Sequence, residues 1–156
     1  MVRLVLGVLA LSLTASVGLA EEMTLTKPNA IEWGAAPPQL PKGAQMAVLS
    51  GDPSRTGPYV VRAKMPGGYQ IPAHSHPTTE NVTVISGTLN IGMGDKLDKK
   101  HGQALKSGGF LSMPPKMNHY AWTSGATVIQ VHGEGPFAID YVNPADDPSK
   151  SGSASR

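Results

Sequence analysis

Short apolar runs separated by turn-forming residues dominate the chain from Gln45 onward. Nine such runs cover residues 46–49, 59–65, 69–76, 81–86, 88–93, 109–113, 119–123, 126–132 and 137–142. Turn-forming pairs such as Gly67-Gly68 and Pro114-Pro115 lie between them. Short runs at this spacing, with no alternation of strands and helices, are typical of antiparallel sandwiches and barrels. The pattern therefore predicts an all-β domain with a closed antiparallel sheet.

The remaining segments do not follow this pattern. Residues 96–105 show only weak helical spacing, and we expect a charged loop there. Residues 21–44 are rich in Pro and predict an N-terminal arm or short edge strand laid over the body. Residues 143–156 are rich in Ser, Asp and Pro, which predicts a flexible C-terminal tail. The expected barrel is thus confined to residues 45–142.

The first twenty residues have the organisation of a secretory signal peptide. Arg3 precedes an apolar run over residues 4–13, and small residues follow at Gly18 and Ala20. A membrane anchor is the alternative, but the strongly apolar segment is far shorter than the roughly 20 residues that span a bilayer. We expect residues 1–20 to be removed after Ala20. The mature protein is then secreted or periplasmic and no longer attached to the membrane.

Composition narrows the classes of function. Gly and Pro make up 32 of the 156 residues, which disfavours a helical bundle. Cysteine is absent, so disulfides, thiolate metal sites and a lipoprotein anchor are excluded. The net charge of +2 and an aromatic fraction of 5% do not suit a nucleic-acid partner. A small molecule is the expected partner.

Histidines and one glutamate form the strongest candidate site. His74 and His76 are two residues apart, so in a strand their side chains share one face, about 6.7 Å apart along the chain. Glu80 follows after Pro77-Thr78-Thr79, where a bend could bring its carboxylate to the same point. His119 lies 39 residues beyond Glu80, at the start of another expected strand.

Three imidazoles and one carboxylate suit a divalent ion of Fe, Mn, Ni, Cu or Zn. An octahedral ion held by four protein ligands keeps positions open for a substrate or dioxygen, which is the arrangement of a reactive site. A polar barrel interior without metal is the alternative.

The spacing of these residues resembles that of a known family, the cupin superfamily. The first cupin motif is matched at every position by Gly68-x5-His74-x-His76-x3-Glu80-x6-Gly87. The second motif is matched more loosely by Gly108-x5-Pro114-x-Lys116-x2-His119. Lys116 stands where the pattern usually has Gly, at a turn that favours positive φ, and Thr123 stands where it usually ends in Asn.

The resemblance implies a single-domain jelly-roll β-barrel with one divalent metal ion inside. The implied metal ligands are His74, His76, Glu80 and His119. It also implies a homodimer, since cupins of this size often pair through their sheet edges. The resemblance does not determine which metal is bound.

Two further polar residues lie in the run that ends at His132. If Gln130 and His132 face inward, they could contact a substrate or hydrogen-bond a metal ligand. If Ile129 and Val131 face inward, both polar side chains meet solvent. Tyr120 and Trp122 lie on the strand face opposite His119, and we expect them to pack between sheets or at a dimer interface.

Two functions are compatible with the sequence. The first is a metal-dependent enzyme acting on a small organic molecule, with dioxygenase chemistry favoured and Glu80 able to act as a base. Isomerase and decarboxylase chemistry stay open, because the fold does not choose among them. The second is a non-catalytic periplasmic module that binds or senses a small ligand through its metal. Polar residues lining the cavity would favour the enzyme, and an apolar cavity would favour the binding module.

Overall fold

The computed structural model describes residues 23–150, and the expected signal peptide over residues 1–20 lies outside them. The elements in chain order are η1 (Pro28–Ala30), β1 (Gly34–Ala35), β2 (Gln45–Ser50), β3 (Gly57–Met65), β4 (Gln70–Ser75), β5 (Glu80–Ser86), β6 (Thr88–Met93), β7 (Gln103–Lys106), β8 (Phe110–Met113), β9 (His119–Thr123), β10 (Thr127–Gly135), β11 (Asp140–Tyr141) and η2 (Pro144–Asp146). Within the described part of the chain, no helix has the length and apolar character needed to cross a membrane.

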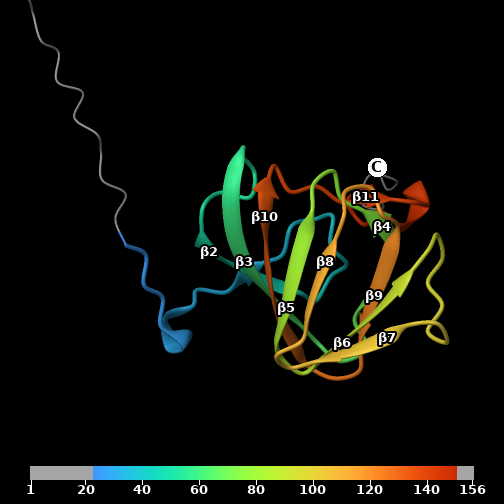
Figure 1. Ribbon diagram of the computed structural model, residues 1–156, viewed down its shortest axis with the longest axis horizontal. Coiled ribbons are helices and arrows are strands. Elements are labelled where there is room, and N and C mark those ends of the chain that lie inside the picture. The colour runs from blue at the N-terminus through green and yellow to red at the C-terminus, as the bar shows by residue number, and fades with distance from the viewer. Residues whose placement is uncertain (1–22, 151–156) are drawn as a thin grey trace, which may run out of the picture.

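The strands form two antiparallel sheets that face each other (Figure 1). The six-stranded sheet has the order β1-β2-β3-β10-β5-β8, and the five-stranded sheet has the order β11-β4-β9-β6-β7. Both sheets also pair strands that are far apart in sequence, as the β3–β10 and β4–β9 pairs show. The expected all-β jelly-roll barrel is therefore confirmed.

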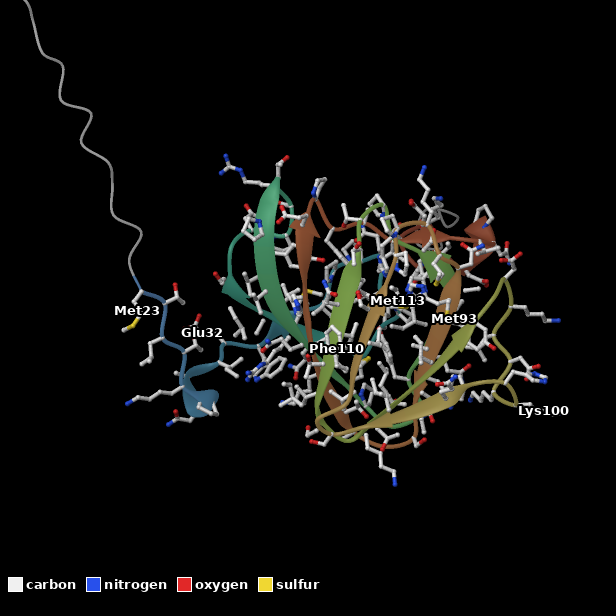
Figure 2. All side chains as sticks on the ribbon, in the orientation of Figure 1. Met23, Glu32, Met93, Lys100, Phe110 and Met113 are labelled. Atoms are coloured by element: carbon white, nitrogen blue, oxygen red, sulfur yellow. The ribbon has the colours of Figure 1, made fainter. Side chains whose placement is uncertain are left out.

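The core lies between the two sheets and follows the alternation of the strands. Val61 of β3 pairs with Val131 of β10, which in turn pairs with Val82 of β5, and all three are buried. The next inward row places Ala63 beside Ile129. Because successive side chains point to opposite faces of a strand, the polar residues between these positions are turned outward. Figure 2 shows the apolar side chains filling the space between the sheets.

The N-terminal segment joins the six-stranded sheet at its edge. Gly34 and Ala35 form β1 and pair with the start of β2. Before β1, the ammonium group of Lys64 lies 5.0 Å from the centre of the Trp33 ring, which attaches the segment to the outer face of β3. Residues further toward the N-terminus lead away from the barrel, with Met23 exposed (Figures 1 and 2).

Two of the expected boundaries were wrong. The segment expected as a charged loop over residues 96–105 contains part of β7, which pairs with β6, for example Leu105 with Leu89. This strand is largely exposed and has little hydrophobic alternation, so its pattern gave no strand signal. The last expected strand, over residues 137–142, is reduced to β11, and residues 137–139 instead cross the mouth of the barrel.

The segment after β11 also contains regular structure. Residues 144–146 form η2, which Asn143 caps by accepting a hydrogen bond from the backbone N–H of Ala145 at 3.1 Å. Asp147 behind it is buried. The described start of the expected flexible tail is therefore folded back onto itself.

Candidate metal centre

An irregularity in β4 positions His74. The β4–β9 pairing advances three residues on β4, from Ile71 to His74, but only two on β9, from Ala121 to His119. Pro72 lies within this bulge, where a residue without an N–H donor is tolerated. The shift places His74 directly opposite His119 across the ladder.

The loop between His76 and Glu80 crosses from one sheet to the other. His76 follows the last residue of β4 in the five-stranded sheet, and Glu80 is the first residue of β5 in the six-stranded sheet. The hydroxyl of Thr78 donates a hydrogen bond to the carbonyl of Glu134 at 2.9 Å, which attaches this loop to β10. The crossing turns the Glu80 carboxylate back toward the imidazoles, as expected from a bend at Pro77-Thr78-Thr79.

A tight turn before β9 positions His119. Lys116 has a φ of 61°, so the residue that replaces the usual Gly does adopt the left-handed conformation. Its backbone N–H donates to the carbonyl of His76 at 2.8 Å, which ties the two histidine-bearing segments together. The strand that follows, β9, begins at His119, which is buried between the sheets.

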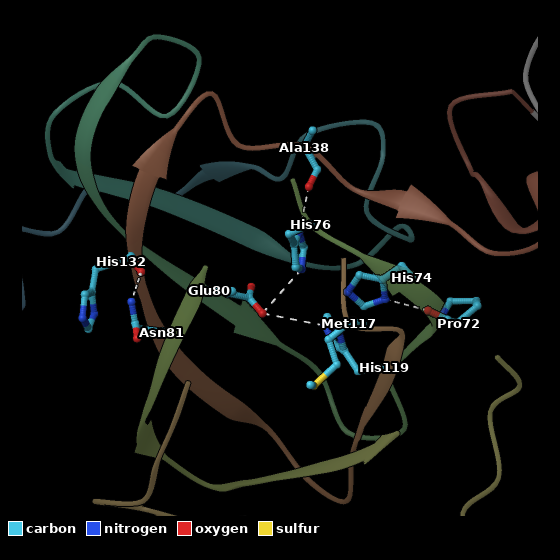
Figure 3. A network of polar contacts seen from close by, with 9 residues as sticks. All are labelled: Pro72, His74, His76, Glu80, Asn81, Met117, His119, His132 and Ala138. Carbon is cyan, nitrogen blue, oxygen red and sulfur yellow. Dashed lines mark hydrogen bonds and ion pairs between the residues drawn. The ribbon is translucent and has the colours of Figure 1, made fainter. Parts of the chain in front are cut away.

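The four side chains meet at one point between the sheets (Figure 3). The imidazoles of His74, His76 and His119 each offer a nitrogen within 4.8 Å of the others, and their residues are 3%, 4% and 2% exposed. Glu80 Oε2 lies 3.4 Å from His76 Nε2 and 3.7 Å from His119 Nε2. The predicted grouping of three histidines with one glutamate is therefore present in the fold.

A hydrogen bond to the backbone orients each imidazole. The Nδ1 atoms of His74, His76 and His119 lie 2.7, 2.7 and 2.9 Å from the carbonyl oxygens of Pro72, Ala138 and Met117 respectively. A carbonyl only accepts, so each Nδ1 must carry the proton. The Nε2 atoms of the neutral rings are then unprotonated and present their lone pairs toward the centre, which is the form that a metal binds.

Burial and the mutual proximity of these groups set their charge states. Burial, together with the nearby His119 and His76 rings, lowers the pKa of His74 to about 3, and burial likewise lowers the pKa of His119. Burial also opposes protonation of His76, but the hydrogen bond and negative charge of Glu80 outweigh it and raise the His76 pKa. The same pairing outweighs burial at Glu80 and lowers its pKa. Two neutral imidazoles thus surround one buried ion pair.

The donor set fits a divalent transition metal. Nitrogen donors bound at about 2.1 Å from one ion lie no more than about 4 Å apart, so small ring movements would close the cluster around it. His76 Nε2 has only the long 3.4 Å contact with Glu80 and, among residues 23–150, is the one buried side-chain nitrogen or oxygen atom without a well-aligned hydrogen bond. Such an orphaned buried atom is costly unless a ligand satisfies it. Imidazole and carboxylate donors match Fe, Mn, Ni, Cu and Zn.

Gln130 and His132 face away from this centre. Gln130 accepts a hydrogen bond from Arg62 Nε at 3.1 Å, on the outer face of the six-stranded sheet. His132 stacks on Phe110 with ring centres 6.4 Å apart and lines a wide outer hollow of about 660 Å³. Of the two alternatives, the structure has the one in which Ile129 and Val131 face inward, so Gln130 and His132 do not contact the metal centre. Figure 3 shows His132 well away from the other histidines.

Tyr120 and Trp122 pack differently from expectation. They stack on one another on the outer face of the five-stranded sheet, with ring centres 6.2 Å apart, and Tyr120 is fully buried there. The loop between β6 and β7 covers them, and the Tyr120 hydroxyl donates to the carbonyl of Asp98 at 3.0 Å. The pair therefore does not pack between the two sheets, and the alternative of a dimer interface stays a prediction.

Sequence reasoning overlooked Phe137. Its ring stacks on His76 with centres 5.2 Å apart and meets the Tyr59 ring edge-on at 6.1 Å. The adjacent carbonyl of Ala138 is the acceptor that orients His76. Nothing in the apolar run over residues 137–142 distinguishes Phe137 from a core residue of a strand, so no signal in the sequence could have identified it.

Comparison with known proteins agrees with this architecture. The structure is similar to the polyketide cyclase RemF from Streptomyces resistomycificus, with a TM-score of 0.67, 14% identity, and coverage of 83% of this chain and 92% of RemF. It is also similar to a candidate acetylacetone dioxygenase from Methylibium petroleiphilum, with a TM-score of 0.64, 15% identity, and coverage of 92% and 100%. An RmlC-like cupin from Shewanella frigidimarina gives a TM-score of 0.56 at 14% identity over 72% and 91%. Identities this low show a shared fold only.

Among curated proteins, no sequence matches this chain. One family model does match, over residues 17–140, and it is described as a domain of unknown function, DUF4437. That match covers the arm and almost the whole barrel, including all four residues of the candidate metal centre. The chain is therefore a member of the DUF4437 family and has the cupin fold.

Proposed function

We propose that this protein is a metal-dependent enzyme of dioxygenase type that acts on a small organic molecule. The observation that carries the proposal is the convergence of three backbone-oriented histidines and Glu80 on one point. A bound metal would supply Lewis-acid chemistry and, if redox-active, the activation of dioxygen. Two structural neighbours, a candidate acetylacetone dioxygenase and an oxalate oxidase, agree with oxidative chemistry on this fold.

Among the possible enzyme reactions, the lining of the central cavity favours oxidation over isomerisation and decarboxylation. Apart from His74, His76 and Glu80, the cavity is lined by apolar side chains and by Tyr69, whose hydroxyl already donates to the Pro41 carbonyl at 2.6 Å. Isomerases and decarboxylases commonly use a positioned acid or base that protonates the product. Glu80 is the one group lining this cavity that can accept a proton without being held by the backbone. Of these reactions, oxidation by dioxygen needs the fewest acidic or basic side chains besides the metal ligands.

The proposed reaction cleaves a carbon–carbon bond of a substrate that binds through two oxygens. Both atoms of dioxygen enter the two products, so the reaction needs no external reductant. The three histidines hold their orientation throughout, because their Nδ1–H groups stay on backbone carbonyls. Glu80 accepts the proton that the substrate loses, and the apolar cavity excludes water.

A binding or sensing module is the second candidate. The outward orientation of Gln130 and His132 favours it, since these residues leave the cavity without added polar groups. Both candidates require the same metal centre. They differ in whether the bound small molecule is consumed.

Oxygen uptake distinguishes the two. The protein, loaded with Fe²⁺ without oxygen and then mixed with acetylacetone or benzoylacetone in air-saturated buffer, should consume oxygen and substrate in equal amounts. The variant H119A should lose this uptake, and H132A, whose ring lies on the outer face, should retain it. Saturable binding of the diketone without oxygen uptake would contradict the enzyme and support the binding module.

We also propose that the protein acts outside the cytoplasm, on the basis of the signal-like segment over residues 1–20. The amino-terminal sequence of the protein recovered from its native host should begin at Glu21. Recovery of the chain with Met1 retained would contradict export.

A further inference from the structure

The cavity in front of the metal centre is too small for an organic substrate. Its volume is about 50 Å³, and its walls include His74, His76 and Glu80. Small-molecule sites in proteins usually enclose about 300 Å³ or more. A substrate larger than a few atoms therefore needs additional space next to this cavity.

A second, larger pocket adjoins the cavity. It has a volume of about 240 Å³ and opens toward solvent beside Pro53 and Ser54. The residues that line both spaces, and therefore form the partition between them, are Met46, Val61, Phe137 and Ile139. Joined together, the two spaces approach the volume of an ordinary small-molecule site.

Phe137 is the largest side chain of this partition. Its ring lies against His76 on one side and against Tyr59 on the other, with centres 5.2 and 6.1 Å away. Met46, Val61 and Ile139 complete the wall. The Phe137 ring is only half-buried, so its exposed side leaves it more freedom to change rotamer than a fully buried side chain has.

The backbone around Phe137 is fixed even though its side chain can move. The Phe137 N–H donates to the carbonyl of Pro53 at 2.7 Å. The next carbonyl, that of Ala138, accepts from His76 Nδ1 at 2.7 Å, as Figure 3 shows. Opening through the ring alone would therefore leave the orientation of His76 intact, whereas displacement of the whole segment would not.

We propose that the Phe137 side chain is a gate between the outer pocket and the metal centre. Resting on the proposed function, we further infer the class of substrate: a small, mainly apolar molecule with two oxygens at one end. The oxygens lie at the metal centre and the apolar body lies where the Phe137 ring and the outer pocket now are. A polar or charged body is disfavoured, because the side chains of the partition are all apolar and offer it no polar partner.

The gate is tested by the rate at which a probe reaches the metal. The protein is loaded with Co²⁺, whose visible absorption reports a change in coordination, and is mixed with benzoylacetone under nitrogen. Removal of the ring in F137A should raise the association rate constant about tenfold or more, and F137W should lower it, because the barrier is steric. Acetylacetone, which is smaller, should show a weaker dependence on residue 137.

Matched controls separate the gate from general loosening of the fold. F110A removes an exposed ring from the outer face of β8 and should leave the association rate unchanged. The Co²⁺ absorption of F137A before mixing should equal that of the unsubstituted protein, since the Ala138 carbonyl still orients His76. If F137A does not fold, F137L provides the smaller side chain. Equal rates in F137A, F137W and the unsubstituted protein would overturn the gate.

A metal-free measurement keeps the gate separate from the proposed function. Ile129 and Val131 line the inner cavity but not the outer pocket. In metal-free F137A, benzoylacetone should shift the methyl NMR signals of these two residues, and in the unsubstituted protein it should shift them much less. Equal shifts would contradict the gate. Failure of every variant to take up Co²⁺, with the difference in methyl shifts present, would contradict the proposed function and leave the gate supported.

Discussion

Each candidate metal-binding histidine is oriented by one hydrogen bond on the side of its ring that faces away from the centre. The acceptors are backbone carbonyls, two of them two residues before the histidine and one on the segment that follows β10. A carbonyl fixes both the direction of the ring and the nitrogen that carries the proton. The consequence is a cluster prepared for a cation before any cation is present. It also holds two imidazoles neutral in a buried place, which makes the metal-free protein sensitive to acid.

The first prediction concerns that sensitivity. Burial lowers the folded-state pKa of His74 to about 3, well below its ordinary value of 6.5. Between these values the unfolded chain binds a proton that the folded chain does not, so the contribution of His74 to the free energy of unfolding is greatest above pH 6.5 and decreases as the pH falls below it. Each such group contributes at most about 1.4 kcal/mol per pH unit. The metal-free protein should therefore be less stable toward urea at pH 4.5 than at pH 6.5.

The variant H74Q should show a shallower dependence on pH over the same interval, because it removes one of the two groups responsible. H101Q, at an exposed histidine of the loop between β6 and β7, should retain the full dependence. His76 does not interfere, since the raised pKa of its folded state changes stability only above pH 6.5. A slope in H74Q equal to that of the unsubstituted protein would contradict the assignment of His74 as a neutral buried base.

At the residue scale, the sequence predicted the three histidines and the glutamate of the site but not which side chains of β10 face it. The spacing of His74 and His76 placed them on one face, and the departure at Lys116 marked the position of positive φ that the structure contains. The sequence could not show which face of β10 points inward, because apolar and polar residues alternate along this strand and either set could face the core. In the structure, Gln130 faces outward and accepts a hydrogen bond from Arg62 on β3. The two residues are 68 positions apart, so the local sequence does not reveal this contact.

At the scale of elements, hydrogen bonds at the turns between strands hold the strands that carry the metal-binding residues in register. Thr123, at the position where the cupin pattern usually ends in Asn, is buried at the end of β9 and makes two hydrogen bonds there. Its hydroxyl donates to the Pro66 carbonyl at 2.6 Å and accepts from the Tyr69 N–H at 3.0 Å. These bonds join the end of β9 to the turn that leads into β4, so they set the register in which His74 meets His119.

The second prediction follows from these two bonds. T123V keeps the shape of the side chain but removes both bonds, so the Pro66 carbonyl and the Tyr69 N–H keep only the longer 3.4 Å hydrogen bond between them. Each hydrogen bond lost costs about 1 kcal/mol. The free energy of unfolding from urea titration should fall by about 2 kcal/mol or more. T83V, on the outer face of β5, should change it by less than about 0.5 kcal/mol. Equal small effects of the two substitutions would contradict a structural role for Thr123.

The elements that the sequence missed are those whose position depends on pairing rather than on pattern. β7 is exposed over most of its length, and its strand conformation is stabilised by antiparallel pairing with β6. The segment over residues 137–139 has the apolar composition of a strand. However, the Phe137 N–H bonds to Pro53 and the Ala138 carbonyl bonds to His76, so it crosses the barrel mouth instead. Neither partner is visible from the local sequence.

At the scale of the whole molecule, the two sheets supply different parts of the centre. The five-stranded sheet and its extensions carry the histidines, and the six-stranded sheet carries Glu80. The centre therefore exists only when the sheets have closed on each other, and a bound cation would hold them together by binding the folded chain alone. Both proposed functions, oxidation of a small molecule and its binding through a metal, depend on this one centre holding a metal.

The most direct test is elemental analysis of the purified protein after metal removal, reloading with each of Fe²⁺, Mn²⁺, Ni²⁺, Cu²⁺ and Zn²⁺, and removal of unbound ions. We predict about one tightly bound ion per chain for at least one of these metals, as expected for a mononuclear site. H132A, with its outward histidine, should bind the same amount, and H76A and H119A should lose it. Retention of the metal by H76A and H119A, or its absence from the unsubstituted protein for all five ions, would contradict the account.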